Sequence, residues 1–252
     1  MQKVVAVDIG NSSMKVAVDT TENLVRINAD LDTERRSAIL ADVVQGLKEP
    51  AQWLVCSVDS QQTAWLREWV SQNRDDDFQL ISTRDVEISS LVEDVEGLGR
   101  DRLLAAWYAA IRTSPGVNSI IVDAGTAVTI DVTVSGVGHV GGLIFPGAST
   151  CLAAVSAQTD ALPDLSKIDP PKLATTLQLG RATESAILLG VHQLQLYGIV
   201  AMVRSLEQQY ADAEVWCCGG AIESVRSLLP TSWNYDRDFL IDAIFHLHEN
   251  WE

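Results

Sequence analysis

The chain has 252 residues and carries 18 Lys and Arg against 34 Asp and Glu, so its formal net charge is 18 − 34 = −16 at pH 7. Hydrophobic residues make up 47% and charged residues 21%, a composition that excludes general disorder and suffices for one large domain or two small ones. Nucleic acids and anionic membranes both bind clustered Lys and Arg, so this acidic chain predicts neither as a partner.

The cysteines and the N-terminus indicate a cytoplasmic protein. The four cysteines show no C-x-x-C spacing and are expected to be free thiols; they are Cys56, Cys151, Cys217 and Cys218. The apolar run at residues 3–7 is too short for a signal peptide, and no stretch is expected to reach the roughly 18 apolar residues that a membrane helix needs.

The first half of the chain alternates short apolar runs with helical patterns. Strands are predicted at residues 3–7, 14–18, 24–29, 53–57 and 78–81, and helices at 33–47, 62–72 and about 101–112. Ser114-Pro115-Gly116 is the clearest break, and it divides the chain into predicted domains at residues 1–114 and 115–252. The second half predicts strands at 120–122, 128–134 and 214–217, with helices at 183–209, 222–229 and 239–248.

The two halves begin alike. Residues 5–11 (VAVDIGN) lie over residues 120–126 (IIVDAGT) at an offset of 123 − 8 = 115 residues, which indicates an internal duplication. In each copy a carboxylate, Asp8 or Asp123, ends a buried strand, and a glycine, Gly10 or Gly125, opens a tight turn. Amides in such a turn can bind a phosphate, and the carboxylate can hold a cation. A turn capped by Asp explains one copy equally well, whereas two copies favour a nucleotide site.

These segments resemble a known superfamily. Residues 8–12 and 123–131 resemble the two phosphate-binding hairpins of the acetate and sugar kinase/Hsp70/actin superfamily. Residues 98–102 (LGRDR) resemble the G-x-D-R element of type III pantothenate kinases, and residues 141–147 (GGLIFPG) their G-G-x-I-x-P-G turn. Residues 180–184 and 219–220 stand where that family has its remaining elements. The resemblance implies two duplicated ribonuclease-H-like (actin-like ATPase) α/β domains with a central cleft.

The resemblance also implies an activity, the transfer of the ATP γ-phosphoryl group to pantothenate as the first step of coenzyme A biosynthesis. Asp101 would be the general base, although it could equally be a helix N-cap. Arg102 would bind substrate or orient Asp101, with a surface salt bridge as the alternative. Gly99 and Arg100 would lie on the substrate side, and Thr183 would reach it across a homodimer interface, unless it simply caps the helix that follows.

On the nucleotide side, the resemblance implies ATP with Mg²⁺ near Asp8 and a monovalent cation, K⁺ or NH₄⁺, near Asp123. The residues that would bind the phosphates and the adenosine of ATP are Asp8, Gly10, Asn11, Ser12, Lys15, Gly125, Thr126, Gly219 and Gly220. An exposed strand lysine is the alternative for Lys15, and a helix-terminal turn for Gly219 and Gly220. The acidity outside the site, including residues 75–77, is expected to be solvated surface.

Three departures and two alternatives stay open. Asp94-Val95 stands where many relatives have Asn-Pro, Arg100 where the residue is often small, and Cys218 where a threonine is frequent. The chain could phosphorylate another small molecule, or it could be a non-catalytic accessory factor for transcription. Residues 136–141 (GVGHVG) match the dinucleotide-binding G-x-G-x-x-G, but the Pro and glycines that follow predict a hairpin turn instead.

Overall fold

A computed structural model describes residues 2–251 of the chain. The chain divides into two compact units, each built from separate segments. The first unit comprises Met1–Ile88, Val92–Tyr108 and Asp238–Glu252, and the second comprises Ser89–Leu91 and Ala109–Arg237. The chain passes from the first unit into the long segment of the second unit after Tyr108, near the boundary predicted after residue 114. The last helix, however, belongs to the first unit and not to the second.

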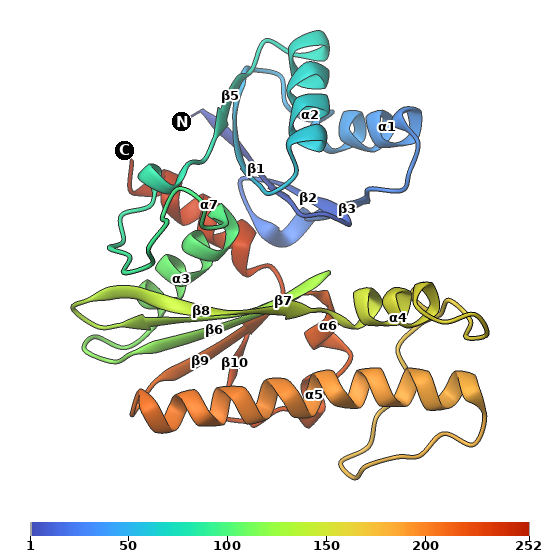
Figure 1. Ribbon diagram of the computed structural model, residues 1–252. Helices are drawn as coiled ribbons and strands as arrows, with labels where there is room; N and C mark the ends of the chain where they lie inside the picture. The colour runs from blue at the N-terminus through green and yellow to red at the C-terminus, as the bar shows by residue number, and fades with distance from the viewer. Residues whose placement is uncertain (1, 252) are drawn as a thin grey trace. The chain divides into compact units, whose positions relative to one another are not determined.

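The first unit is built on a five-stranded mixed sheet of order β3-β2-β1-β4-β5 (Figure 1). Its strands are β1 (Lys3–Ile9), β2 (Ser13–Val18), β3 (Val25–Asn28), β4 (Ala51–Ser57) and β5 (Asp77–Leu80). Strands β1, β2 and β3 are antiparallel neighbours, whereas β4 pairs parallel with both β1 and β5. Central strands covered on both faces read as continuous apolar runs, which explains why β1 and β4 were predictable from sequence.

Helices cover both faces of this sheet. On one face, α1 (Thr33–Val44) and α2 (Ser60–Asn73) bury Leu40, Leu66 and Trp69 against alternate strand residues such as Val7 and Trp53. On the other face, α7 (Phe239–Glu249) contacts β1, β2 and β4. The ring of Tyr108 in α3 (Arg100–Arg112) meets Phe239 of α7 edge-on, with 4.9 Å between the ring centroids. The apolar face of α7 therefore completes the first core, although it follows the second unit in sequence.

The second unit repeats the plan. Its sheet has the order β10-β9-β6-β7-β8, which is the first sheet's order read from the other edge (Figure 1). The strands are β6 (Ser119–Ala124), β7 (Ala127–Val134), β8 (Gly138–Pro146), β9 (Glu214–Cys218) and β10 (Asn234–Tyr235). Ile199 and Val203 of helix α5 (Thr183–Gln209) pack in the core of this sheet. The predicted duplicated α/β fold is confirmed.

Several short elements complete the chain. They are the 3₁₀ turns η1 (Thr21–Asn23), η2 (Thr83–Asp85) and η3 (Arg226–Leu228), and helices α4 (Ala148–Ala157) and α6 (Gly220–Glu223). The helix predicted at residues 222–229 is therefore wrong, because a one-turn helix and a 3₁₀ turn replace it. The run 141–147 is not a turn either: β8 continues through it to Pro146, and the unpredicted α4 follows.

Two expectations about the surface are wrong. Asp76 is not solvated, since only 1% of its side chain is exposed and it bonds to Arg74 and to the indole of Trp53. Helix α5 is long and apolar enough to cross a membrane by length and composition, and only 22% of its apolar window is buried. Its apolar residues are not confined to the buried face: Ile199 and Val203 pack in the second unit's core, while Leu194 and Tyr197 are exposed.

Candidate functional site

The first phosphate-binding candidate lies at the carboxyl end of β1. Asp8 stands directly opposite Lys15 in the β1–β2 register and beside Cys56 in the β1–β4 register. Side chains opposite one another in a sheet share a face, and Lys15 Nζ donates to Asp8 Oδ2 at 3.0 Å. Both side chains are nearly buried, with 13% of Lys15 and 10% of Asp8 exposed. The strand register therefore builds a paired carboxylate and ammonium at the base of the hairpin.

The tip of this hairpin is held from two sides. The Gly10 N–H donates to the Ser13 carbonyl at 3.0 Å, and the Gly10 carbonyl accepts from Gln62 Nε2 at 3.1 Å. Asn11 and Ser12 at the turn are exposed, where backbone amides can meet an anion. The structure thus brings Asp8, Gly10 and Lys15 together in one hairpin whose turn is held by hydrogen bonds.

Gln62 connects the hairpin to helix α2 and was missed by the sequence analysis. Its amide also donates to Asp59 Oδ2 at 3.0 Å, while Asp59 Oδ1 accepts from the Gln62 N–H at 2.9 Å and caps the helix. The side-chain hydrogen bond from Gln62 is the main reason that the pKa of Asp59 is lowered. A detectable signal existed, because Asp59-x-x-Gln62 has the spacing of a capping box.

The G-x-D-R element forms the start of α3. The helix begins at Arg100, and the Gly99 carbonyl accepts from the Leu103 N–H at 3.1 Å. Asp101 therefore lies in the first turn, and the alternative that it is the N-cap is wrong. Its Oδ1 accepts from the Arg102 N–H at 2.8 Å and lies 2.5 Å from where a side chain at Gly99 would begin. Only glycine at position 99 allows this placement of the carboxylate.

Four charged side chains of this region act on the buried thiol of Cys56. Burial raises the pKa of its thiol well above the usual value, and the carboxylates of Asp8 and Asp101 raise it further. Arg100 and Lys15 act in the opposite direction. Two carboxylates and two cations therefore lie within electrostatic reach of one thiol, so the first unit brings the two halves of the expected site together. The two negative and two positive side chains balance each other here, even though the whole chain is acidic.

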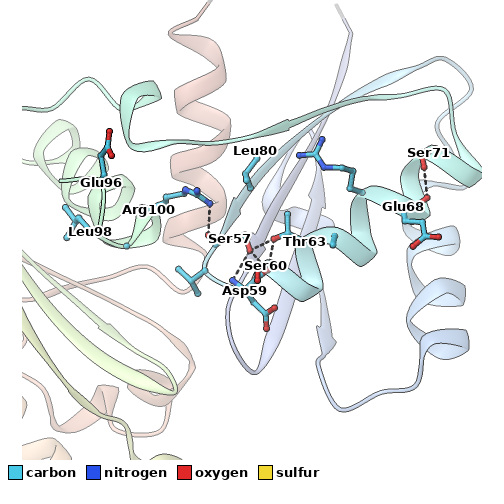
Figure 2. A pocket seen from close by; sticks show the side chains of 14 residues that line it. Ser57, Asp59, Ser60, Thr63, Glu68, Ser71, Leu80, Glu96, Leu98 and Arg100 are labelled. Carbon is cyan, nitrogen blue, oxygen red and sulfur yellow. Dashed lines mark hydrogen bonds between the residues drawn. The ribbon is translucent and has the colours of Figure 1, made fainter. Parts of the chain in front are cut away.

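A cavity of about 880 Å³ adjoins this cluster (Figure 2). Arg100 reaches toward it, and its guanidinium donates to the Ser57 carbonyl at 3.5 Å. Neither Asp8 nor Asp101 lines the cavity. The lining residues come from the end of β4, from α2 and β5, and from the loop before α3: Ser57, Val58, Asp59, Ser60, Thr63, Ala64, Arg67, Glu68, Ser71, Leu80, Glu96, Leu98, Gly99 and Arg100.

The second hairpin is built differently. Gly125 N–H donates to the Ala127 carbonyl at 2.9 Å, as Gly10 does in the first copy. The Thr126 carbonyl accepts from the Gly147 N–H at 2.9 Å and from the Thr150 hydroxyl at 2.6 Å. A side chain at Gly147 would begin 2.1 Å from the Gly125 carbonyl. The end of the G-G-x-I-x-P-G element thus supports this turn through its backbone.

Gly219 supports the same hairpin from the next strand. It has φ +89°, caps α6, and leaves only 2.4 Å between a would-be side chain and either the Ala124 carbonyl or Asp123 Oδ1. Gly220 is the first residue of α6. The expected glycine pair therefore lies where β9 passes into α6, with Gly219 next to the carboxylate of the second hairpin.

Thr183 lies at the first position of α5 and is exposed. The cap of that helix is Ala182, whose N–H donates to the Ser185 hydroxyl at 3.2 Å, so the alternative role of Thr183 as a cap is wrong. A side chain at Gly180 would begin 2.2 Å from the Ala186 nitrogen. This close approach explains the glycine of the 180–184 element.

Among residues 2–251, no group of three or more His, Cys, Asp and Glu side chains could hold a metal alone. A lone carboxylate still fits Mg²⁺ bound with a nucleotide, because that ion takes one or two carboxylates and completes its shell with phosphates and water. Asp8 offers such a carboxylate, with one oxygen on Lys15. At Asp123, Gly219 packs closely, and a side chain at position 219 would begin 2.4 Å from Asp123 Oδ1.

Known proteins resemble the chain along most of its length. A family model described as type III pantothenate kinase matches residues 4–206. The type III pantothenate kinase of Thermus thermophilus is 28% identical over 251 residues, covering 96% of this chain and 97% of the relative. That of Desulfovibrio desulfuricans is 30% identical over 239 residues, covering 88% of each chain.

Solved structures share the fold at low sequence identity. A Campylobacter jejuni protein assigned to the Baf family of transcriptional activators has a TM-score of 0.58 at 18% identity and covers 98% of each chain. A non-polymerisable ParM mutant has a TM-score of 0.55 at 9% identity, covering 99% of this chain and 100% of the other. These structures place the chain among actin-like folds and say nothing more of its chemistry.

Proposed function

The chain belongs to the type III pantothenate kinase family, and we propose that it transfers the γ-phosphoryl group of ATP to the primary hydroxyl of pantothenate, the first step of coenzyme A biosynthesis. The observation that carries this proposal is the charged cluster around Cys56. It joins the G-x-D-R carboxylate Asp101 to the hairpin pair Asp8 and Lys15 within one unit. An acceptor base beside a phosphate-binding hairpin is what an in-line phosphoryl transfer requires.

In this proposal Asp101 acts as the general base. Its carboxylate accepts the hydroxyl proton as the pantothenate oxygen attacks the γ-phosphorus, and the bond to the bridging oxygen of ADP breaks. The backbone of Gly99 and the guanidinium groups of Arg100 and Arg102 would bind and orient the substrate. Arg100 also borders the cavity near α2, which supports a role for it on the substrate side.

Both hairpins would bind the phosphates of ATP. The first offers Gly10, Asn11, Ser12 and the Lys15 ammonium, and the second offers the turn of Gly125 and Thr126. Asp8 would hold Mg²⁺, which neutralises phosphate charge when bound. Gly219 and Gly220 would lie under the adenosine.

Asp123 would hold the monovalent cation, K⁺ or NH₄⁺. One feature supports this role, the residue opposite Asp123 in the hairpin. In the first hairpin that place holds Lys15, whereas in the second it holds the uncharged Thr129. In this proposal the monovalent cation would take the place in the second hairpin that the Lys15 ammonium has in the first.

We propose a cytoplasmic homodimer that binds neither nucleic acid nor a membrane. Support comes from the exposed apolar side chains in and just before α5, where Leu179, Leu194 and Tyr197 are 84%, 66% and 41% exposed. An apolar surface on a helix calls for a partner, and a second copy would let Thr183 reach the substrate. Sedimentation velocity should show a dimer, and Leu194→Glu with Tyr197→Glu should shift it to monomer; a monomeric wild type would contradict the interface.

An assay of ADP release with ATP, Mg²⁺, K⁺ and pantothenate tests the function. Turnover is expected, and Asp101→Asn should lower kcat by about 10²–10⁴-fold because the base is lost. Asp42→Asn, an exposed carboxylate on α1, is the matched control and should retain full activity. Turnover of another primary alcohol but not pantothenate would reassign the substrate. No turnover of any alcohol would favour a non-catalytic role.

A further inference from the structure

A three-residue segment before α3 pairs with the second unit's sheet. The chain leaves the first unit after Ile88 and returns to it at Val92, and Ser89–Leu91 between them belong to the second unit. There the His139 N–H of β8 donates to the Ser89 carbonyl at 2.8 Å, and the Leu91 N–H donates to the His139 carbonyl at 2.9 Å. Ser90 and His139 form an isolated parallel bridge. We call Ser89–Leu91 the docked segment.

Gly138 makes room for the docked segment. It has φ +114°, and a side chain there would begin 2.2 Å from the Ser89 carbonyl oxygen and 3.0 Å from the Ser89 Cβ. The G-x-G-x-x-G run at residues 136–141 thus has a structural purpose unrelated to dinucleotides. Its second glycine lets the backbone of a distant segment pack directly on the start of β8.

The side chain of His139 also contacts the docked segment. Its side chain is fully buried, with Nδ1 3.1 Å from Ser90 Oγ and Nε2 2.8 Å from Asp131 Oδ1. A carboxylate can only accept a hydrogen bond, so Nε2 carries a proton and donates it to Asp131. This bond fixes the ring, which leaves Nδ1 facing the Ser90 hydroxyl. A buried carboxylate thereby orients the imidazole that holds Ser90.

The docked segment leads into the catalytic element after a short loop. Residues 92–99 separate it from Arg100, and a tight turn uses part of that length, since Asp94 Oδ1 accepts from the Gly97 N–H at 2.9 Å. The Leu98 N–H also donates to the Val95 carbonyl at 3.3 Å. The loop is short and partly held by its own hydrogen bonds, so the position of one end restricts the position of the other.

We propose that the docked segment positions the loop of residues 92–99, so that Ser90, Gly138 and His139 are positioning residues for the substrate side of the site. This inference rests on the proposed kinase function, because residues 99–102 are assigned there to substrate binding and catalysis. The contacts at β8 set one end of the loop.

Gly138→Ala tests the docking, with Gly136→Ala as the matched control. Both glycines have positive φ, but a side chain at Gly136 meets nothing within 4 Å, so the control carries the backbone strain without the clash. In Gly138→Ala the Leu91 amide and residues 92–99 should exchange hydrogen at least tenfold faster than in the control. Equal exchange in the two variants would overturn the docking.

Kinetics of the same pair test the positioning. Gly138→Ala should raise KM for pantothenate several-fold and leave KM for ATP unchanged, whereas general loss of folded protein would lower the apparent kcat and neither KM. Ser90→Ala should act in the same direction, by roughly 2–10-fold for one lost hydrogen bond. Ser89→Ala is its control, since Ser89 contributes backbone contacts and keeps its Cβ.

The two readouts separate the possible failures. Hydrogen exchange needs no substrate, so it tests the docked segment even if the wild type does not phosphorylate pantothenate. Faster exchange in Gly138→Ala with an unchanged KM for pantothenate would show that the segment docks but positions nothing, and would overturn the proposal. Faster exchange together with the higher KM would support it.

Discussion

The two hairpins share one strand plan but are held in different ways. In the first, side chains do the holding: Lys15 pairs with Asp8 across the strands, and Gln62 bonds the carbonyl at the tip. In the second, backbone packing replaces them, with Gly147 and Gly219 approaching within distances that only glycine allows. A duplicated scaffold has therefore kept its topology while changing the chemistry that stabilises each turn.

The difference has a functional meaning. In the proposed function, the first hairpin would bring the Lys15 ammonium to the phosphates, whereas the second would take a monovalent cation from solution at Asp123. Both carboxylates also have a cysteine beside them in the parallel strand, Cys56 next to Asp8 and Cys218 next to Asp123. The two hairpins thus share a carboxylate beside a cysteine at the strand end. They differ in the residue opposite that carboxylate, which is Lys15 in the first hairpin and Thr129 in the second.

Breaking the glycine-braced turn should have the largest effect. Gly219→Ala forces a methyl group against the Ala124 carbonyl at positive φ, and we expect it to lower the free energy of unfolding by about 2–5 kcal/mol. Urea unfolding followed by fluorescence measures the change. Gly116→Ala is the matched control, because Gly116 has φ +82° with nothing within 4 Å, so it should cost only about 1–2 kcal/mol. Equal losses would show that the close approach at 219 is unimportant.

The next largest effect is expected from removing the Lys15 ammonium group of the first hairpin. Lys15→Met leaves Asp8 without its facing ammonium and removes the proposed phosphate ligand, so kcat/KM for ATP should fall by about 10²-fold. Steady-state kinetics at varied ATP measure it.

Lys3→Met is the control for the loss of a lysine from the same sheet. Lys3 pairs with Asp19, but 59% of its side chain is exposed, and such pairs contribute about 0–1 kcal/mol to stability. An equal loss of kcat/KM in both variants would assign the effect to net charge and not to the site.

Sequence predicted the strand ends of both hairpins but not what braces them. Asp8 and Gly10 follow an apolar run directly, so local pattern suffices to find the turn. The sequence predicted Gly147 as part of a turn. In the structure this position needs glycine because it packs against the Gly125 carbonyl, which is 22 residues away in sequence. Contacts of that kind leave no periodic signal.

The same limit explains the other misses. Helix α7 completes the first core from the far end of the chain, and no local pattern records which sheet an apolar helix covers. The G-x-D-R residues were found by family resemblance, since spacing alone says only that a helix begins there. The apolar character of α5 was visible in the sequence, but the pattern alone could not show that Leu194 and Tyr197 stay exposed.

A smaller effect is expected from the brace at Gln62. Gln62→Glu replaces the donor to the Gly10 carbonyl by an acceptor and faces it with the Asp59 carboxylate, so KM for ATP should rise by about tenfold. Gln61→Glu adds the same charge on the exposed side of α2 and should leave KM unchanged. Gln62→Lys can still donate to both partners and should restore most of the affinity. A rise in KM with Gln61→Glu would point to long-range charge.

The effect at Asp76 should depend on pH, because this carboxylate braces the first unit's sheet by charge as Lys15 braces its hairpin. Burial alone would raise the pKa of Asp76, but hydrogen bonds from Arg74, Trp53 and the Ala51 N–H outweigh it and hold the pKa below the usual value of an aspartic acid. A carboxyl with a lowered pKa in the folded state stabilises fully above its unfolded value and loses that contribution as pH falls. Stability should therefore decline below about pH 4.

Asp76→Asn tests this acid dependence and with it the contrast between the units. The variant should lose about 1–3 kcal/mol at pH 7 and show a flatter decline below pH 4, because the titrating group is gone. Asp75→Asn, its exposed neighbour, should match the wild type at every pH. Hydrogen exchange resolved by peptide should show the acid opening in β4 and β5 before β6 and β9, since the second unit's hairpin is braced by glycine contacts that do not titrate. Simultaneous opening of both sheets would mean that the two modes of bracing make no difference to acid stability.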